Sequence, residues 1–345
     1  MTSLDELGRR LAAVRDPHPA PDPGVEDAIA DSVRYLGSDD AMRSLEADVY
    51  WPKWHSPWWH MLLLFEIGEA RRIPERAIAQ MIAALDAFPI KIFPVHAGEL
   101  PPAANPYRDV LCHCALGSVW QVLAACGRDV ERELPWFAPW FPRYQMADGG
   151  LNCDDSAYRV DSECPSSMVG TIAPLEAMLV APRHAWSADH AAFVERAARF
   201  LIERRLTLGS QTVHNAEERV SQVAWLAPCF PRFYFYDVLR GLAALVRWAE
   251  ITGSRIPLRA IAGVLDHLLA AFPDGVVWRQ RVAFATTGTW MFDAAGQWQR
   301  RDLAFRSPLV DATSAIGPCP YLTRQWSATR RALGRLLDAA RIDDT

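Results

Sequence analysis

Lysine is almost absent from this chain of 345 residues, so arginine carries nearly all of the positive charge. We attribute the shortage to genomic base composition rather than to function. The formal net charge is −5 and the isoelectric point is near 6.0. Such a balance leaves no basic surface of the kind that binds nucleic acid, and we expect no nucleic-acid partner.

The chain also lacks long apolar runs and the motifs of several large enzyme classes. No stretch approaches the roughly 20 apolar residues that a membrane span needs, and the N-terminal residues contain no apolar signal core. We find no P-loop, no dinucleotide-binding glycine fingerprint, no serine-hydrolase elbow and no His-Glu-x-x-His motif. The seven cysteines follow no framework of disulfide spacings. We therefore expect reduced thiols and a cytoplasmic location.

Helix-length segments dominate what is present. A proline-rich linker at residues 16–24 separates a short N-terminal helix from the rest, and strand-like alternation is scarce. Beyond the linker, markedly apolar segments alternate with amphipathic segments rich in Arg and Glu. The apolar segments cover 59–68, 107–126, 166–180, 236–252 and 327 onward, and the amphipathic ones cover 74–88, 129–144, 188–206 and 257–272.

This alternation predicts an all-α fold, a single (α/α) toroid in which apolar inner helices are covered on all sides and outer helices face water on one stripe. Residues 1–25 would form an N-terminal arm and linker, and residues 26–345 the toroid domain. An open superhelical array is the alternative, but its repeats are usually shorter and more uniform.

One connection between segments carries a recognisable motif. Gln145-x-x-Asp148-Gly149-Gly150-Leu151 resembles the Gln-x-x-Asp-Gly-Gly-Trp repeat of the terpenoid cyclase and protein prenyltransferase superfamily of α/α toroids. The two glycines allow the positive φ that such a turn needs. Leu151 stands where the repeat has Trp. By helix alternation the resemblance extends over roughly residues 30–340, although only this repeat carries a good motif.

The residues after that turn are similar to a second motif. Asn152-Cys153-Asp154-Asp155-Ser156-Ala157 resembles the Asp-x-Asp-Asp-Thr-Ala acid motif of class II terpene cyclases. The resemblance implies that Asp154 or Asp155 stays protonated and donates a proton to an alkene or epoxide. Clustered carboxylates raise one another's pKa, which suits that role. Asn152 replaces the first Asp of the motif. The alternative is that both acids cap the following turn.

Aromatic residues gather before two of the apolar segments, at 51–60 and 230–237. We expect Trp58, Trp59 and Tyr236 to line a cavity for an apolar substrate. Tyr158 would be a catalytic residue beside the two acids, and Asp148, which would shape the turn, is a further candidate for substrate binding. The alternative for each ring is a place in the hydrophobic core.

Metal binding is a second interpretation of the same region. Protein prenyltransferases hold zinc through Asp, Cys and His, and the resemblance implies Cys153 as a ligand, with Asp154 and with His113 or His214 arriving from elsewhere. Their ligand pattern does not carry over residue by residue. In Cys112-His113-Cys114, consecutive helical residues lie about 100° apart, so the two thiols should point in widely separated directions. At most one or two of these three would reach a common ion.

The sequence therefore predicts an enzyme acting on a mainly apolar small molecule in the central cavity of a toroid. The reaction would be an acid–base cyclisation or isomerisation in specialised biosynthesis. A metal-dependent toroid enzyme that uses Cys153 with zinc, copper or iron is one alternative. A non-catalytic toroid that binds a ligand or protein through its Trp-rich edges is the other.

Overall fold

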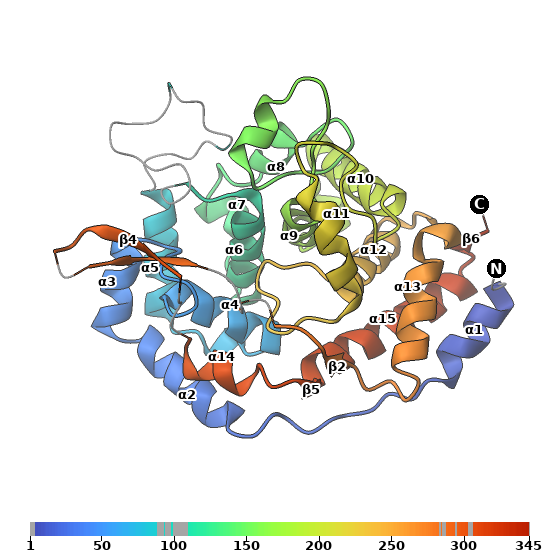
Figure 1. The fold of residues 1–345 in the computed structure, drawn as a ribbon, viewed down its shortest axis with the longest axis horizontal. Coiled ribbons are helices and arrows are strands. Elements are labelled where there is room, and N and C mark those ends of the chain that lie inside the picture. The colour runs from blue at the N-terminus through green and yellow to red at the C-terminus, as the bar shows by residue number, and fades with distance from the viewer. Residues whose placement is uncertain are drawn as a thin grey trace.

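The computed structural model describes residues 4–87, 93, 98, 110–282, 284, 288–293, 295–302 and 306–344. These residues are mostly helical and contain only short strands (Figure 1), which confirms the all-α class. None of the described helices is both long enough and apolar enough to cross a membrane.

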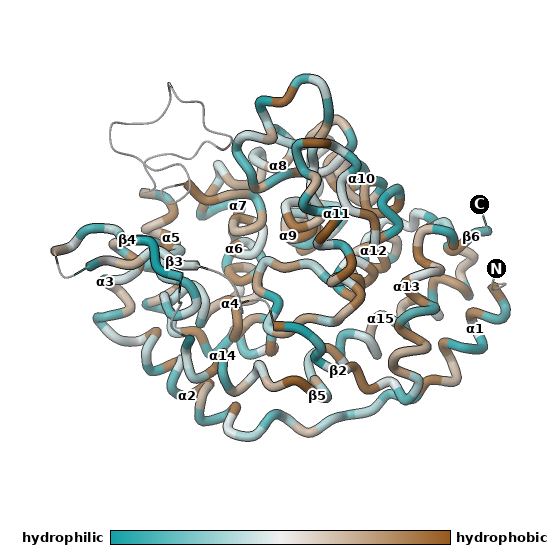
Figure 2. Tube along the Cα trace, viewed as in Figure 1, coloured by the Kyte–Doolittle hydropathy of each residue, from teal (hydrophilic) through white to brown (hydrophobic). Residues whose placement is uncertain are grey.

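All five apolar segments form helices; the first four are mostly buried, whereas the fifth exposes a stripe that includes Arg331 and Arg335. They are α4 (Pro57–Ile67), α6 (His113–Ala125), α9 (Met168–Met178), α12 (Val238–Thr252) and α15 (Pro320–Asp338). Each packs against the next in chain order. Arg324 of α15 also donates a hydrogen bond, 2.9 Å long, to the carbonyl of Ile67 at the end of α4. The last of these helices therefore contacts the first. Figure 2 shows hydrophobic stretches, in brown, along α9 and α12 in the interior.

The amphipathic segments form α5 (Glu75–Asp86), α10 (Ala188–Glu203) and α13 (Leu258–Ala271). The prediction of one helix over 129–144 was wrong, because the chain forms two short helices there, α7 (Val130–Glu133) and α8 (Trp140–Tyr144). Pro135 and Pro139 lie between them, and a proline has no N–H to continue a helix.

The remaining elements surround this core. The helix α1 (Leu4–Ala13) packs against α15, and the two chain ends lie on the same side of the molecule (Figure 1). The other helices are α2 (Val25–Leu36), α3 (Asp39–Ala47), α11 (Glu217–Ser221), α14 (Pro308–Ala312), η1 (Ala70–Arg72), η3 (Asp155–Arg159), η4 (Arg183–Ala185) and η5 (Gln222–Leu226).

The strands pair two by two. The pair β1 (Ile256–Pro257) and β6 (Ile342–Asp343) is parallel; β2 (Trp278–Arg279) with β5 (Gly317–Pro318), and β3 (Thr289–Phe292) with β4 (Trp298–Arg301), are antiparallel. The β3–β4 hairpin borders the cavity described below.

The helices α6 and α9 pack closely against each other at Gly117. A Cβ placed there would lie 2.4 Å from the backbone carbon of Ala173 and 2.4 Å from the backbone nitrogen of Pro174. We expect Gly117→Ala to lower the free energy of unfolding by about 2 kcal/mol, because two backbones must separate. Gly263→Ala is the matched control. It lies in α13 with no atom within 4 Å of the added Cβ, so it should stabilise by about 0.5–1 kcal/mol. Urea unfolding of both variants measures the difference, and equal midpoints would contradict the close packing.

Candidate metal centre

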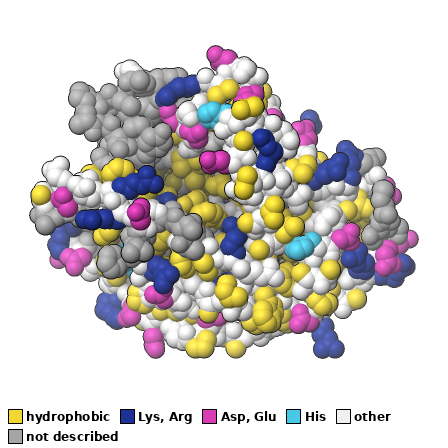
Figure 3. Space-filling view, in the orientation of Figure 1, with side chains coloured by type: hydrophobic (Ala, Val, Ile, Leu, Met, Phe, Trp, Pro, Cys, Tyr) yellow, Lys and Arg dark blue, Asp and Glu magenta, His cyan; other side chains and the backbone are white. Residues whose placement is uncertain are grey.

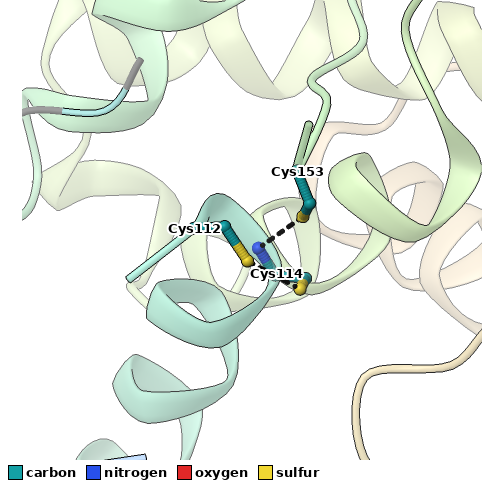
Figure 4. A group of neighbouring side chains, drawn as sticks. All are labelled: Cys112, Cys114 and Cys153. Carbon is teal, nitrogen blue, oxygen red and sulfur yellow. Dashed lines mark hydrogen bonds between the residues drawn. The ribbon is translucent and has the colours of Figure 1, made fainter. Parts of the chain in front are cut away.

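Three cysteine side chains meet where α6 begins (Figure 4). Cys112 precedes the helix, Cys114 is in its first turn, and Cys153 comes from the loop before η3. The sulfurs all lie within 4.8 Å of one another. Those of Cys112 and Cys114 are 3.3 Å apart, and the backbone N–H of Cys114 donates to the Cys153 sulfur at 3.4 Å. In the described part of the chain, no other three potential metal ligands gather this closely.

The prediction that Cys112 and Cys114 point in widely separated directions was wrong. It assumed that both residues are helical, whereas α6 begins at His113 and Cys112 is its extended N-cap, with φ −84° and ψ 172°. The extended backbone places the Cys112 sulfur beside that of Cys114. The ring of His113 does not join them, since no ligand atom of this residue belongs to the group.

His113 instead lies among aromatic rings. Its imidazole is buried and stacks on Tyr158, with centroids 5.7 Å apart, while Phe93 and Tyr144 each form a T-shaped pair with it. Neither ring nitrogen has a hydrogen-bond partner among the described residues. Burial lowers the pKa of His113 to about 4, so the ring is neutral. Burial likewise raises the pKa of the Tyr158 phenol well above its ordinary value.

The surroundings of the three thiols favour a negative charge on only one of them, Cys112. Hydrogen bonds from Cys114 and Cys153 hold the pKa of Cys112 well below its ordinary value, and the backbone N–H of Ala115 at the helix N-terminus acts in the same direction. The pKa values of Cys114 and Cys153 are raised, first of all by their hydrogen bonds to Cys112. Cys112 is therefore the thiol that ionises first.

A cavity of about 670 Å³ adjoins this cluster. Its walls come from the segments leading into α4, α6, η3 and α12, and from the β3–β4 hairpin. Cys112 and Cys153 border it, while Cys114 is buried behind them. Most of the other wall residues are aromatic or aliphatic. Figure 3 shows a hollow lined by hydrophobic side chains next to the hairpin.

Lys53 is the residue of this cavity that the sequence prediction missed. Its side chain is buried, and its Nζ donates a hydrogen bond to the Tyr234 hydroxyl at 3.0 Å. The ammonium lies over four rings, 4.9–5.6 Å from the centroids of Tyr50, Trp51, Trp54 and Tyr234. Burial lowers its pKa to about 8. A signal did exist, because only two of the 36 basic residues are lysines, so each of them stands out.

The contacts of the two candidate acids, Asp154 and Asp155, do not suit a proton donor. Asp154 accepts hydrogen bonds from Ser156 and lies 2.9 Å from His214 Nε2. Burial raises its pKa, but these hydrogen bonds outweigh burial and hold the pKa below its ordinary value. Asp154 also caps η3, as the alternative interpretation proposed. Asp155 borders the cavity and forms an ion pair with Arg159.

The other residues predicted to bind substrate lie away from the cavity wall. Trp58 and Trp59 are buried in the core, and the Trp59 indole donates to the carbonyl of Tyr50 at 2.9 Å. Tyr236 is buried and donates to the carbonyl of Leu206 at 2.8 Å. Asp148 shapes its turn as expected, because its carboxylate accepts the N–H of Gly150 at 3.1 Å.

A second cavity, of about 440 Å³, lies between the five apolar helices. Charged side chains face it, including Glu66 of α4 and the ion pair of Glu176 with Arg240, whose atoms approach to 2.6 Å. Gln121 and Gln325 add amide groups. More charged side chains therefore line the centre of the helix assembly than line the cavity beside the thiols.

The cluster has the chemistry of a metal centre with an open side. Thiolate sulfur is a preferred zinc ligand, and three protein ligands leave the fourth position of a tetrahedral ion for water or substrate. Sulfur atoms around one such ion are about 3.8 Å apart, a spacing between the 3.3 Å that separates the Cys112 and Cys114 sulfurs and the 4.8 Å within which all three sulfurs lie. No known protein family, curated protein or solved structure matches the chain, so its function has to be argued from this geometry.

Proposed function

We propose that the protein is a metal-dependent enzyme in which Cys112, Cys114 and Cys153 hold a zinc ion and a mainly apolar small molecule binds in the adjoining cavity. The observation that carries the proposal is the meeting of three thiol sulfurs within 4.8 Å at the wall of a cavity of about 670 Å³. Structural zinc sites usually have four protein ligands, whereas catalytic sites keep one position open. Such an ion would supply Lewis acidity at that position.

This site is a better candidate for chemistry than the carboxylates. A general acid must keep its proton at working pH, and the hydrogen bonds to Asp154 favour its charged form instead. Among the thiols, Cys112 suits its proposed role, because a metal ligand must be deprotonated and the pKa of Cys112 lies well below its ordinary value. Cyclisation or isomerisation remains the proposed reaction class, assisted by the metal rather than by an aspartic acid.

We also propose that the helices form an α/α toroid related to the terpenoid cyclase and prenyltransferase superfamily. The contacts of the apolar helices in chain order, with α15 returning to α4, support a ring. The helices α10 and α13 pack against this set as outer helices would. The motif supports it too: the Gln145 amide donates to the carbonyls of Gly149 and Phe193, at 2.8 and 3.0 Å, and so ties the turn to α10.

Elemental analysis by mass spectrometry tests the metal. The protein should be purified without chelators and without a metal-binding tag, and we expect about one equivalent of zinc. Cys153→Ser should lose it. Cys126→Ser, which removes a half-buried thiol at the other end of α6, should keep it. Copper or iron in the same stoichiometry would retain the centre and change the ion. A wild-type protein without metal, or unchanged metal in Cys153→Ser, would overturn the proposal.

A further inference from the structure

The ammonium of Lys53 is buried with hydrogen-bonding capacity to spare. The residue is 8% exposed, and its Nζ carries three N–H donors, of which the Tyr234 hydroxyl accepts one. Among the described residues no carboxylate forms an ion pair with it and no other group accepts its hydrogen bonds. Burying a charge is costly unless it is paired, and aromatic faces compensate only part of that cost.

The position of this lysine is fixed from both sides of the cavity. The backbone N–H of Lys53 donates to Thr289 Oγ1 on β3 at 2.8 Å, which ties the segment before α4 to the hairpin. Tyr234, on the segment before α12, holds the other end of the side chain. All three residues border the cavity of about 670 Å³. A side chain held in this way is a preorganised contact for a ligand.

No carboxylate on the described part of the cavity wall forms an ion pair with the ammonium. Asp155, the carboxylate on the described wall, pairs with Arg159. Arg300 at the exposed rim adds a second positive charge rather than a negative one. The thiols lie close enough to favour the charged lysine, but no hydrogen bond joins Lys53 to any of them. A ligand bound in the cavity would therefore find N–H donors of Lys53 that no described residue occupies.

We propose that the ligand of this cavity is an organic carboxylate, whose charged end binds Lys53 and Tyr234 while its apolar body lies among the aromatic wall residues. One ammonium and one phenol match a carboxylate, whereas phosphate sites usually offer an arginine fork or several backbone N–H groups. The inference rests on the proposed function only in placing the reacting part of that carboxylate beside the thiols. The contact with Lys53 itself needs no metal.

Two probes of the same shape test whether a negative charge on the ligand strengthens binding to the cavity. Phenylacetate and its neutral analogue phenylacetamide share an aromatic body, and isothermal titration calorimetry gives the affinity of each. We expect the wild-type protein to bind phenylacetate about tenfold or more tightly than phenylacetamide. Lys53→Met keeps the length of the side chain and should abolish this preference without weakening the amide. Lys53→Arg keeps the charge and should retain part of the preference.

Controls separate this inference from folding and from the metal. Arg71→Met removes an exposed charge on η1, at the other end of α4, and should change neither affinity. Circular dichroism should show that all the variants are folded. Equal binding of the two probes by the wild type, binding of neither at millimolar concentration, or a preference that survives Lys53→Met would each overturn the inference. If the Cys153→Ser variant lacks metal but still prefers phenylacetate, the carboxylate inference is upheld. A wild-type protein without metal would overturn only the proposed function.

Discussion

Cys112→Ser is expected to lower the affinity of the chain for zinc by more than about a hundredfold. Removing a partner that only orients a metal ligand already costs about 10–100-fold, and the loss of a ligand itself should cost more. Cys112 is also the thiol whose pKa lies well below its ordinary value. The substitution therefore removes the ligand that is easiest to deprotonate, and metal binding requires deprotonated thiols. Competition with a chelator of known affinity measures the change.

Cys126→Ser is the matched control for this experiment. Both substitutions exchange one half-buried thiol at an end of α6 for a hydroxyl, so their general effects on folding should be similar. Of these two residues, Cys112 has its sulfur within 4.8 Å of two other cysteine sulfurs, whereas Cys126 does not belong to the cluster. Equal zinc affinities in the two variants would show that the metal binds elsewhere or that the cluster binds none. Turnover, once a substrate is known, should fall with metal content.

The helical framework was the part of this structure most open to prediction. Segments such as 238–252 are long, apolar and free of proline, so their burial as helices follows from composition and length. The failure over 129–144 has an equally local cause, because Pro135 and Pro139 interrupt a segment whose amphipathic pattern is otherwise helical. The pattern of apolar and amphipathic segments does not predict which helix packs against which, because this depends on contacts such as that at Gly117.

The candidate site was less predictable because it depends on where one helix begins and on side chains from distant parts of the chain. Because α6 begins at His113 and not before it, the side chains of Cys112 and Cys114 come together. The spacing of the two cysteines in the sequence does not predict where the helix begins. The pKa of Asp154 is set partly by His214, sixty positions away, which the motif cannot reveal. Lys53 was overlooked because the shortage of lysine was explained at the level of the genome, whereas the position of a rare residue is information about that residue.

The largest loss of stability is expected for Asp237→Asn. Asp237 is fully buried at the N-cap of α12, where it accepts hydrogen bonds from Arg232 at 2.6 and 2.9 Å and from the N–H groups of Arg240 and Cys229. Asparagine would leave the buried guanidinium of Arg232 without its countercharge. Removing one partner of such a pair costs about 3–5 kcal/mol. Asp266→Asn is the control, because its pair with Arg10 is exposed and should contribute under about 1 kcal/mol. Urea unfolding of both variants at neutral pH measures these losses.

Acid unfolding gives an independent check on the same pair. Burial raises the pKa of Asp237, but the charge and hydrogen bonds of Arg232 outweigh burial and hold it below its ordinary value. A carboxyl whose pKa is lower in the folded state stabilises the fold above the unfolded-state pKa of about 4, and this stabilisation is lost as the pH falls through the folded-state value. The wild type should therefore lose stability more steeply below pH of about 4 than Asp237→Asn does. If the free energy of unfolding fell equally steeply with acid in the wild type and in Asp237→Asn, the ion pair would not be coupled to folding. In that case the loop from Cys229 to Asp237, which carries Tyr234 into the cavity, would have to be held in place by other contacts.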